Sequence, residues 1–404
     1  MSDDRPLWSG RFAEPPTAEA ASLGRSLGFD LRLAAHDVRA SIAHVEALED
    51  ARLLSSDDAD ALRRALCEVG DEIAAGTYVV HPADEDVHSA IERAVTDRLG
   101  DLGARLHAGR SRNDLVMTDL RLWMLERHEH IVEGVLRMLV ALLAHAGEHA
   151  GTAMPGTTHL RAAQPVTLGH HLLAHAWALI RDLGRLDDWR DRADVSPLGA
   201  GALGTSTLGI DPAAGARRLR FARVFENSID AVSDRDVVQE LLSAIAICAT
   251  HLSRLAADLA RFSDPALRWA HLSDAYSTGS SMMPQKRNPD VAELARAKAG
   301  RVLGDLVTLT TVLHGLPLGY HRDLQEDKEA VFDAVDTIEV TLAALAGCVD
   351  TTTFDAAAMR AATEDPNVYA TDVAEALVAA GIPFREAHAR VGALLARLAP
   401  EGRT

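Results

Sequence analysis

The segment 279–290, with the sequence G-S-S-M-M-P-Q-K-R-N-P-D, carries the densest set of reactive groups in the chain. It places two adjacent hydroxyls a few residues before Lys286 and the amide of Asn288, and two prolines and a glycine keep it out of a helix. Beyond it a helix is expected, with Asn288 as the N-cap and Pro289 at the first helical position. A lysine and small hydroxyls beside a helix N-terminus form a site suited to a carboxylate or a phosphate.

Three further polar clusters lie where helical stretches begin or end. One covers residues 106–114, L-H-A-G-R-S-R-N-D, and precedes a long helical pattern. Another covers 154–165 and contains His159, which alone fits either a hydrogen-bonded core histidine or a general acid or base. The last covers 320–328, Y-H-R-D-L-Q-E-D-K. A helical bundle can bring such helix ends into one polar cleft, and four cation-bearing clusters there suit a small polycarboxylate substrate.

Long proline-free stretches supply the elements that must position these clusters. Apolar residues recur at helical spacing around 131–143, and similar patterns cover 167–192, 235–261, 290–312 and 324–345. Alternating β-branched runs are nearly absent. The sequence therefore predicts an all-α protein with a central bundle of about five unusually long helices, and such helices are expected to pack in a bundle that continues across subunits. The expected domains are 1–107 (N-terminal, helical), 108–353 (central bundle) and 354–404 (C-terminal, helical).

The bulk composition limits the partners. The 404 residues include 41 basic and 59 acidic side chains, a formal charge of −18, which argues against nucleic acid or an anionic membrane surface as a main partner. The acidic N-terminus leads into no apolar segment of a secretory signal, and no apolar run approaches the ~18 residues of a membrane span. Three widely spaced cysteines, Cys67, Cys248 and Cys348, are expected as reduced core thiols of a cytoplasmic protein.

Several histidines have spacings that invite a metal but are interpreted as structural. His145 and His149 have i, i+4 spacing, yet no carboxylate or cysteine pattern accompanies them, so no metal is expected there. His170, His171 and His175 are expected in helix packing or in interface hydrogen bonds. The sequence therefore predicts no metal site.

A glycine pattern at 199–204 matches G-x-G-x-x-G but lacks the context of a dinucleotide site. It follows Ser196-Pro197-Leu198 rather than a strand, and no evident helix opens after it. A flexible loop that faces a substrate is the expected structure. No nucleotide cofactor is therefore predicted from this motif.

Taken together, the motifs resemble a known family. Segment 279–290 is similar to the signature G-S-S-x-M-P-x-K-x-N-P of the fumarase/aspartase superfamily. Within that superfamily the argininosuccinate lyase family is resembled by W-S-G-R-F at 8–12, E-D-V-H at 85–88, G-R-S-R-N-D at 109–114 and L-Q-E-D-K-E-A-V-F-D at 324–333. The resemblance implies reversible β-elimination of argininosuccinate to arginine and fumarate, in arginine biosynthesis, without metal or nucleotide. It also implies a three-domain fold and a homotetramer whose active sites take residues from three subunits.

The signature residues fit the demands of that reaction. Removing a proton α to a carboxylate creates a doubly negative aci-carboxylate, which fixed cations and donors must stabilise; Lys286, Asn288 and the amides of the following helix start are suitable. By resemblance Ser280 is the catalytic base, its alkoxide stabilised by Lys286 and backbone amides. His159 is then the general acid to the departing guanidinium nitrogen, and Glu293 pairs with it and sets its tautomer.

The resemblance also assigns substrate contacts. Thr158, Lys286 and Asn288 are expected to hold the succinyl end, while Gln325 and Lys328 are expected to recognise the arginine part or its carboxylate. The other positions that match the cleft of the family are Ser26, Asp30, His88, Ser111, Arg112, Asn113 and Tyr320.

The chain departs from the family pattern at a few positions. Arg161 and Ala162 stand where the family usually has Gln and Arg, Leu115 where it usually has Gln, and Thr157 where it has an aromatic residue or His. Altered tuning rather than lost chemistry is expected from these changes. The chain also ends roughly half a hundred residues before the usual family length, so domain 354–404 is expected to be incomplete.

Two alternatives remain open. Adenylosuccinate lyase, another lyase of the superfamily, often has K-R-N-P in its loop, as at 286–289, but nucleotide-binding features are missing here and the motif at 8–12 favours the first family. A non-catalytic structural protein on the same scaffold, as in lens crystallins of the family, is the other alternative. The joint retention of the four proposed catalytic side chains speaks against it.

Overall fold

The computed structural model describes residues 16–398, so the motif at 8–12 lies outside the described residues. The chain separates into two compact units. The first contains the described residues up to His130 with Arg185–Ala244 and Leu303–Asp336, and the second contains Ile131–Gly184, Ile245–Val302 and the described residues from Thr337 on. Each unit is thus built from segments far apart in the sequence. The division into 1–107, 108–353 and 354–404 stays a prediction.

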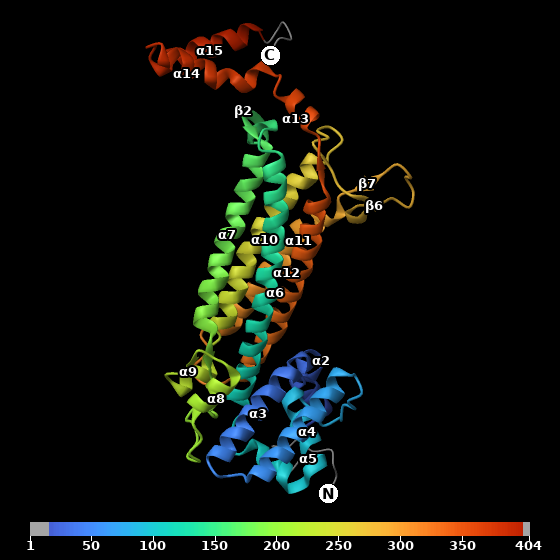
Figure 1. The fold of residues 1–404 in the computed structure, drawn as a ribbon, viewed down its shortest axis with the longest axis vertical. Coiled ribbons are helices and arrows are strands. Elements are labelled where there is room, and N and C mark those ends of the chain that lie inside the picture. The colour runs from blue at the N-terminus through green and yellow to red at the C-terminus, as the bar shows by residue number, and fades with distance from the viewer. Residues whose placement is uncertain (1–15, 399–404) are drawn as a thin grey trace. The chain divides into compact units, whose positions relative to one another are not determined.

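Five long helices form the framework and run side by side in Figure 1. The all-α prediction is confirmed, and helix starts expected at 167, 235 and 290 agree within one residue. The start expected at 324 is later, because residues Arg322–Glu326 form a 3₁₀ turn that precedes the helix. Each long helix contributes residues to both units. They are α6 (Arg112–Glu148), α7 (Leu168–Ala193), α10 (Asp236–Phe262), α11 (Asp290–Leu313) and α12 (Asp327–Thr351).

The first unit adds short helices whose starts are marked by capping side chains. Ser55 accepts a hydrogen bond from the Asp58 amide at the start of α4, and Asp86 accepts one from the Ser89 amide at the start of α5. These caps satisfy amides that have no partner inside the helix. The elements are α1 (Ala18–Gly24), α2 (Leu27–Asp30), α3 (Ala34–Asp50), α4 (Ser56–Ala74), α5 (Val87–Leu99), α8 (Pro212–Leu219) and α9 (Ser228–Ser233), with the short strands β3 (Val195–Ser196) and β4 (Arg223–Val224) and 3₁₀ turns at Leu31–Leu33 and Gly100–His107.

The second unit contains a feature that the sequence reasoning missed, a β-hairpin over the second polar cluster. Strands β1 (Ala153–Thr158) and β2 (Arg161–Thr167) pair antiparallel and are joined by His159 and Leu160. Alternation is interrupted there by two prolines and a register shift after Pro155, so the period-2 signal is weak. The other elements are β5 (Ala270–His271), β6 (Thr278–Gly279), β7 (Arg287–Asn288), β8 (Thr353–Phe354), α13 (Ala356–Ala362), α14 (Ala370–Ala379) and α15 (Phe384–Leu398), with 3₁₀ turns at Asp274–Tyr276 and Pro366–Tyr369.

Helices α6 and α10 are long and apolar enough, by length and composition, to cross a membrane. The share of their apolar windows buried inside the structure is 44% for α6 and 56% for α10. Core helices of a large bundle need such apolar faces, and burial accounts for part of the apolar composition of each helix.

The three cysteines are all free, and two of them lie where expected. Cys248 and Cys348 are buried, but Cys67 is exposed, so its assignment as a core thiol is wrong. The buried positions of α4 include Leu62, Leu66 and Val69. Helical periodicity places residue 67 on the opposite, solvent-facing side of that stripe.

A fully buried charge cluster lies at the start of α12. Asp327 bonds to the Arg235 guanidinium through one oxygen, and its other oxygen lies 3.0 Å from the Lys328 ammonium. Burial alone would raise the pKa of Asp327, but Lys328 and Arg235 outweigh it and hold that pKa below its usual value. The carboxylate therefore stays charged and compensates two buried cations.

We expect Asp327→Ala to destabilise the protein by about 3–5 kcal/mol, because removing one partner leaves buried charge uncompensated. The midpoint of urea unfolding, followed by circular dichroism, measures the effect. Asp336→Ala on the same helix is the control, since its pair with Arg32 is exposed and such pairs contribute about 0–1 kcal/mol. Equal midpoints for the two variants would contradict the assigned role of Asp327.

Candidate active site

The first unit contains a cavity of about 490 Å³, and the second unit contains one of about 460 Å³. The cavity of the first unit is formed where α5 and α6 begin and where the chain approaches α12. The lining brings together five of the residues expected at the site, Ser111, Arg112, Asn113, Tyr320 and Gln325. Five further residues complete it: Glu85, Asp86, Glu92, His107 and Arg322.

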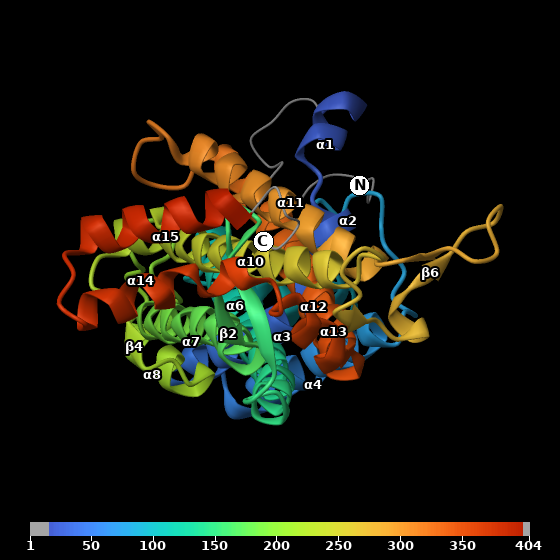
Figure 2. The ribbon, with the colours of Figure 1, turned by 90° about the horizontal axis from the view of Figure 1, so that it is seen from above.

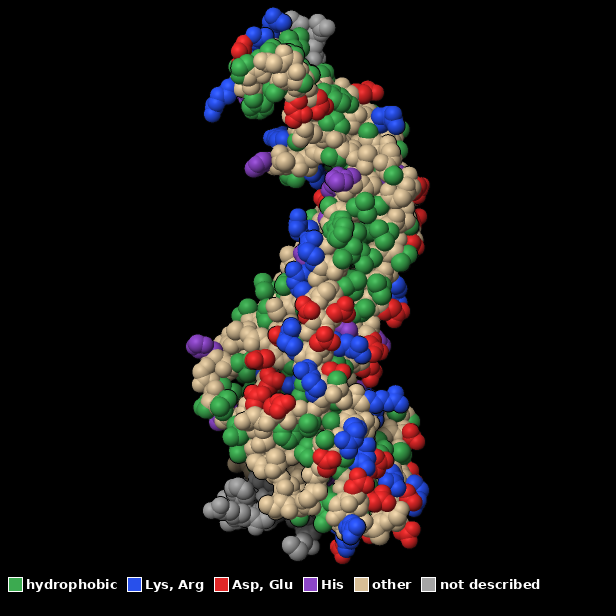
Figure 3. All heavy atoms as spheres, turned by 60° about the vertical axis from the view of Figure 1, so that its left-hand side comes forward, with side chains coloured by type: hydrophobic (Ala, Val, Ile, Leu, Met, Phe, Trp, Pro, Cys, Tyr) green, Lys and Arg blue, Asp and Glu red, His purple; other side chains and the backbone are tan. Residues whose placement is uncertain are grey.

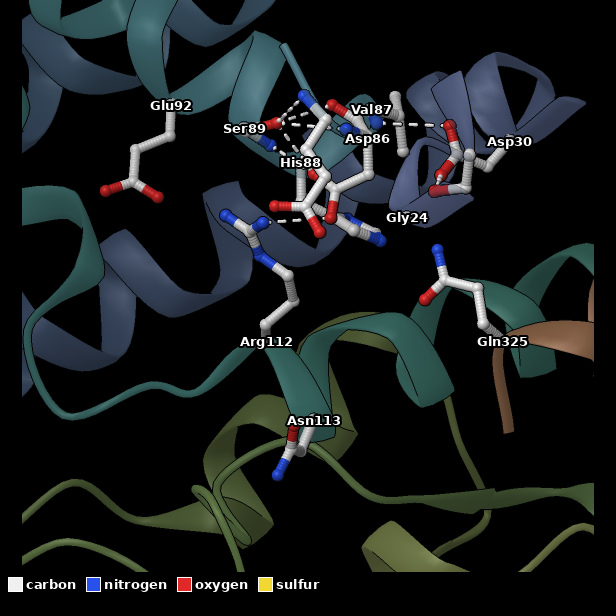
Figure 4. Close-up of polar contacts among 12 residues, drawn as sticks. Gly24, Asp30, Asp86, Val87, His88, Ser89, Glu92, Arg112, Asn113 and Gln325 are labelled. Atoms are coloured by element: carbon white, nitrogen blue, oxygen red, sulfur yellow. Dashed lines mark hydrogen bonds and ion pairs between the residues drawn. The ribbon is translucent and has the colours of Figure 1, made fainter. Parts of the chain in front are cut away.

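The Asp86 carboxylate has two partners in this cavity. Its Oδ1 accepts the Ser89 amide at 2.7 Å as the N-cap of α5, and its Oδ2 accepts a hydrogen bond from Arg112 Nη1 at 2.8 Å. Figure 4 shows the Arg112 guanidinium turned toward Asp86. Burial raises the pKa of Asp86, yet the Arg112 charge and the helix-cap bonds reverse that effect and lower it. Both side chains are therefore charged and hold each other in place.

Further charges of both signs line the same cavity. Arg322 Nη2 lies 2.5 Å from Glu85 Oε1 and also donates to the Gly24 carbonyl. His107 Nδ1 lies 3.2 Å from Glu92 Oε2. Burial disfavours the charged form of Glu92, but the bond and charge of His107 lower its pKa overall. The cavity thus offers carboxylates to a cationic group and arginines to an anionic one.

The two polar residues at the end of the cavity contact each other. Tyr320 Oη donates to Gln325 Oε1 at 3.2 Å, which leaves the amide group of Gln325 for other partners. Burial raises the pKa of Tyr320, so its hydroxyl stays protonated and remains a donor.

Four expected contact residues support the cavity instead of lining it. Ser26 Oγ donates to Asp30 Oδ2 at 2.6 Å, and Asp30 Oδ1 accepts the Val87 amide at 3.1 Å, so this pair fixes the first turn of α5. Lys328 is buried against Asp327. His88 belongs to a deeper cluster, described next.

His88 is buried among carboxylates. Its Nδ1 lies 2.6 Å from Asp37 Oδ2 and 3.4 Å from Asp119 Oδ2. Burial raises the pKa of Asp119 well above its usual value, and the Asp37 charge adds to the effect. The raised pKa of Asp119 favours its protonated form, which avoids a bare carboxylate in the core. His88 therefore connects the first turn of α5 to Asp37 and lies close to Asp119.

Loop 199–204 is tied to the start of α6, so the expectation of a flexible loop is wrong for its first half. Asp114 Oδ2 accepts the amides of Gly199 and Gly201, both at 2.9 Å, and Asn113 Nδ2 donates to the Ala202 carbonyl at 3.0 Å. Both glycines have positive φ, which fits the tight approach. Neighbouring Leu115 packs in a core cluster, so its departure from the family pattern is a packing feature.

In the second unit, the signature segment forms a loop between β6 and β7 that extends away from the helices in Figure 2. Thr278 pairs with Asn288 and Gly279 with Arg287. This pairing holds Asn288 extended, and its amide lies 3.4 Å from both Thr278 Oγ1 and the Gly279 carbonyl. Helix α11 begins only at Asp290, and the Pro289 carbonyl accepts the Glu293 amide. The expected N-cap role of Asn288 is therefore wrong; the residue closes the loop instead.

Ser280 lies at the start of this loop, and its hydroxyl accepts two backbone amides. The amides of Met282 and Met283 donate to Ser280 Oγ at 3.3 Å and 3.1 Å. Lys286 is exposed in the same loop, and its amide donates to the Met283 carbonyl at 3.1 Å. Two amides that converge on one oxygen stabilise negative charge there.

Two cavities border the loop, of about 460 Å³ and 660 Å³. Both are lined by Gln285, Arg287, Asn288 and Glu293, and Lys286 lines the larger one. Glu293 is exposed in the first turn of α11. The helix start, the lysine and the amide thus face open space on one side of the loop, as an anion site requires.

His159 occupies the tip of the β1–β2 hairpin. Both His159 (φ 53°) and Leu160 (φ 58°) have positive φ, as a two-residue turn between antiparallel strands requires. His159 and Thr158 are exposed, and Thr157 Oγ1 accepts from Arg261 at 3.2 Å. No hydrogen bond joins His159 to Glu293 among the described residues, so a single chain does not form the expected pair.

Sequence reasoning gave no role to Glu85, Asp86, Glu92, His107 or Arg322, although they line the cavity. A signal existed for Asp86, because D-V-H-S at 86–89 has the spacing of a capping box. A side chain held at a helix start beside an arginine is a candidate for a site. Glu85, His107 and Arg322 lie inside motifs noted in the sequence, but nothing there assigned them a role, and Glu92 lies outside those motifs.

Comparisons with known proteins identify the family of the chain. Residues 10–304 match the family model described as Lyase, and 367–404 match Argininosuccinate lyase C-terminal. The argininosuccinate lyase of Kineococcus radiotolerans is 51% identical over 396 residues, 98% of this chain and 82% of that protein. That of Mycolicibacterium smegmatis is 49% identical over 388 residues, 96% and 83% respectively.

Solved structures show the same fold. EDDS lyase in complex with formate has 28% identity and a TM-score of 0.85 over 95% of this chain and 76% of that one. Class II fumarase from Schistosoma mansoni, at 17% identity and a TM-score of 0.76 over 85% and 81%, supports the fold alone. With half of its residues identical over nearly its whole length, this chain belongs to the argininosuccinate lyase family.

Proposed function

We propose that the chain catalyses reversible β-elimination of argininosuccinate to arginine and fumarate, with Ser280 as the base. The observation that carries this is the pair of amides donated to Ser280 Oγ within the signature loop, in a chain about half identical to argininosuccinate lyases. Donors aimed at a hydroxyl oxygen favour its alkoxide over its neutral form. They therefore make a serine a stronger acid and its alkoxide available as a base.

The reaction then runs as a proton removal followed by loss of the nitrogen. Ser280 takes the proton next to the carboxylate, and the electron pair of that C–H bond forms the aci-carboxylate. Lys286 and Asn288, at the start of α11, stabilise its charge. The electrons then form the C=C bond of fumarate while the C–N bond breaks, and the departing guanidinium nitrogen takes a proton from His159. Glu293 orients His159 when the two residues come from different chains.

The cavity of the first unit takes the arginine part of the substrate. Its carboxylates, Glu85, Asp86 and Glu92, suit the guanidinium and ammonium groups, and Arg112 and Arg322 suit the carboxylate of that end. Gln325 adds amide donors and acceptors. Ser26, Asp30, His88 and Lys328 act on this site by fixing the helix starts that carry it.

Two apolar strips support self-association as a homotetramer with shared sites. Leu136, Val140 and Leu143 on α6 and Leu173, Trp177 and Ile180 on α7 are exposed at i, i+4, i+7 spacing. Figure 3 shows hydrophobic side chains gathered along the long helices. Contiguous exposed apolar surface of this kind marks an interaction site, so the strips are the proposed subunit contacts.

The proposed setting is the cytoplasm, in arginine biosynthesis, with no nucleic-acid or membrane partner. The three free cysteines fit a reducing compartment. The acidic net charge of −18 gives no basic footprint for nucleic acid or an anionic membrane surface.

Replacing Ser280 by Ala should lower kcat roughly a thousandfold, because a general base contributes about that much, while the native mass and circular dichroism stay unchanged. Fumarate release, followed by ultraviolet absorbance, measures turnover with argininosuccinate and, in a parallel arm, adenylosuccinate. Ser281→Ala is the matched control, since its side chain is exposed in the same loop. Full turnover by Ser280→Ala rejects Ser280 as the base, and turnover only with adenylosuccinate rejects the substrate.

Asp86→Asn should raise KM for argininosuccinate by roughly tenfold to a hundredfold, since a hydrogen bond to a charged group contributes about 1.5–3 kcal/mol. Asn is as good an N-cap as Asp, so the variant removes the charge that holds Arg112 and keeps α5. Ser89→Ala is the control: it weakens the capping box but leaves the Asp86–Arg112 pair intact. An unchanged KM in Asp86→Asn would exclude the cavity from substrate binding.

Introducing charge into an apolar strip should break the assembly. Trp177, which is 60% exposed in the isolated chain, is replaced by Asp, and the native mass is expected to fall from that of a tetramer to that of smaller species, with loss of turnover. Val79→Asp is the control, because Val79 is 83% exposed and lies outside both strips. A tetramer in Trp177→Asp would show that α7 is not a subunit contact.

The proposal that sites are shared between chains is tested by mixing two variants. Ser280→Ala and Arg112→Ala chains, each inactive alone, are unfolded together and refolded. Sites assembled from different chains regain part of the turnover in mixed tetramers, whereas sites confined to one chain stay inactive.

A further inference from the structure

A separate cavity of about 260 Å³ lies between α7 and α10 and has no part in the proposed reaction. Three of its lining residues are histidines, and one is a carboxylate in contact with two of them. The lining consists of His171, Ala174, His175, Ala178, Arg181, His251, Arg254 and Asp258.

The imidazoles of His171 and His175 converge on one oxygen. The two residues are one helical turn apart on α7, so their side chains share a face. Nε2 of His171 lies 2.8 Å from Asp258 Oδ2, and Nε2 of His175 lies 2.9 Å from the same atom. The histidine rings are edge to face, with centroids 5.4 Å apart. The expected hydrogen-bonding role of these histidines is therefore correct, but it is not their whole chemistry.

Asp258 is the candidate third ligand because its Oδ2 contacts both imidazoles and its side chain is only partly exposed. One donor atom from each of the three residues lies within 4.8 Å of the other two. Two imidazole nitrogens and a carboxylate oxygen are a donor set that zinc and similar ions prefer.

We propose that His171, His175 and Asp258 bind a divalent transition-metal ion of the zinc type, with a fourth position open to the cavity. Zinc bonds of about 2.0–2.2 Å in tetrahedral geometry place ligand atoms roughly 3.3 Å apart. The present contacts of 2.8 Å and 2.9 Å must widen by roughly half an ångström. Side-chain rotation supplies that, since all three side chains are partly exposed.

The surroundings suit an ion whose fourth ligand is a water or a small anion. Arg181 and Arg254 line the cavity and are exposed, so they can face a negative ligand at the open position. His251 lines it too and is oriented by Asp182, whose Oδ2 lies 2.7 Å from its Nδ1. A histidine held by a carboxylate in this way is a common neighbour of metal sites.

The ligand face is distinct from the apolar strip of α7. At 100° per residue, His171 and His175 point to the side opposite Leu173, Trp177 and Ile180. A second group, His145, Glu148 and His149, has similar spacing. Its nitrogens already contact Val349 O and Thr152 Oγ1, and no second helix contributes a ligand. A third group among the described residues, Asp37, His88 and Asp119, is buried and offers a single imidazole. The site between α7 and α10 is therefore the best of the three.

The test uses the intact purified protein, stripped with a chelator and titrated with Zn²⁺ by calorimetry, and with Co²⁺ by visible absorption, which reports nitrogen and oxygen ligation. We expect one ion per chain. His175→Ala and Asp258→Asn should each weaken binding at least about a hundredfold, because even outer-shell partners contribute tenfold to a hundredfold. His170→Ala, an exposed neighbour of His171, is the matched control and should bind like the wild type.

Three results would overturn the site. They are the absence of a stoichiometric ion in the wild type, wild-type binding by both ligand variants, and loss of binding in His149→Ala with retention in His175→Ala. Asp258→Asn keeps the shape of the side chain, so a folding defect in His175→Ala leaves one informative variant. Lyase turnover, which uses none of these residues, checks that each variant is folded and keeps the proposed function separate from this one.

Discussion

Buried or half-buried carboxylates at helix starts are the constraint on which the rest of the structure depends. Asp86 caps α5 and holds Arg112, Asp114 in the first turn of α6 holds loop 199–204, and Asp327 opens α12 and compensates two buried cations. Such positions are favourable for negative charge, because helix N-termini carry unpaired amides and a positive dipole end. Each carboxylate then has capacity left for a cation or a loop. The polar cavity of the first unit is a consequence of this double use.

The signature loop is held in place by interactions of a different kind. Among the described residues no buried carboxylate fixes it; a two-residue ladder between β6 and β7 closes its base, and the amides of Met282 and Met283 donate to the Ser280 hydroxyl. Local bonds of this kind position the serine without positioning the lysine, which stays exposed at the other end of the loop. The proposed base is thus held in place within one chain, while the stabilisation of the substrate carboxylate depends on the groups that the loop contacts. In the proposed homotetramer, other chains would supply the remaining partners of this loop.

The sequence predicts the long helices well because their signal is long-range periodicity, which averages over local exceptions. It fails where one or two contacts decide. Asn288 is a residue type favoured at N-caps, but it pairs with Thr278 and is part of a strand. Loop 199–204 is rich in glycine, which favours flexibility, but the Asp114 carboxylate accepts the amides of Gly199 and Gly201. The signature loop is recognised from its residue types and the family resemblance, and its catalytic role stays a prediction. Most charged residues of the cavity in the first unit could not be found from the sequence, because their neighbours come from distant segments that no local pattern connects.

Helix α6 carries both a residue of the proposed substrate cavity and residues of the proposed subunit contact. It carries Arg112 in its first turn and exposed Leu136, Val140 and Leu143 further along, and at 1.5 Å per residue it is a rod of roughly 55 Å. A rod transmits the position of its apolar part to its polar end, because bending a packed helix breaks its hydrogen-bond ladder. Burying the strip against other subunits would therefore fix the placement of Arg112 as well. In the proposed tetramer, the contacts that bury these exposed side chains would therefore also help to complete the site.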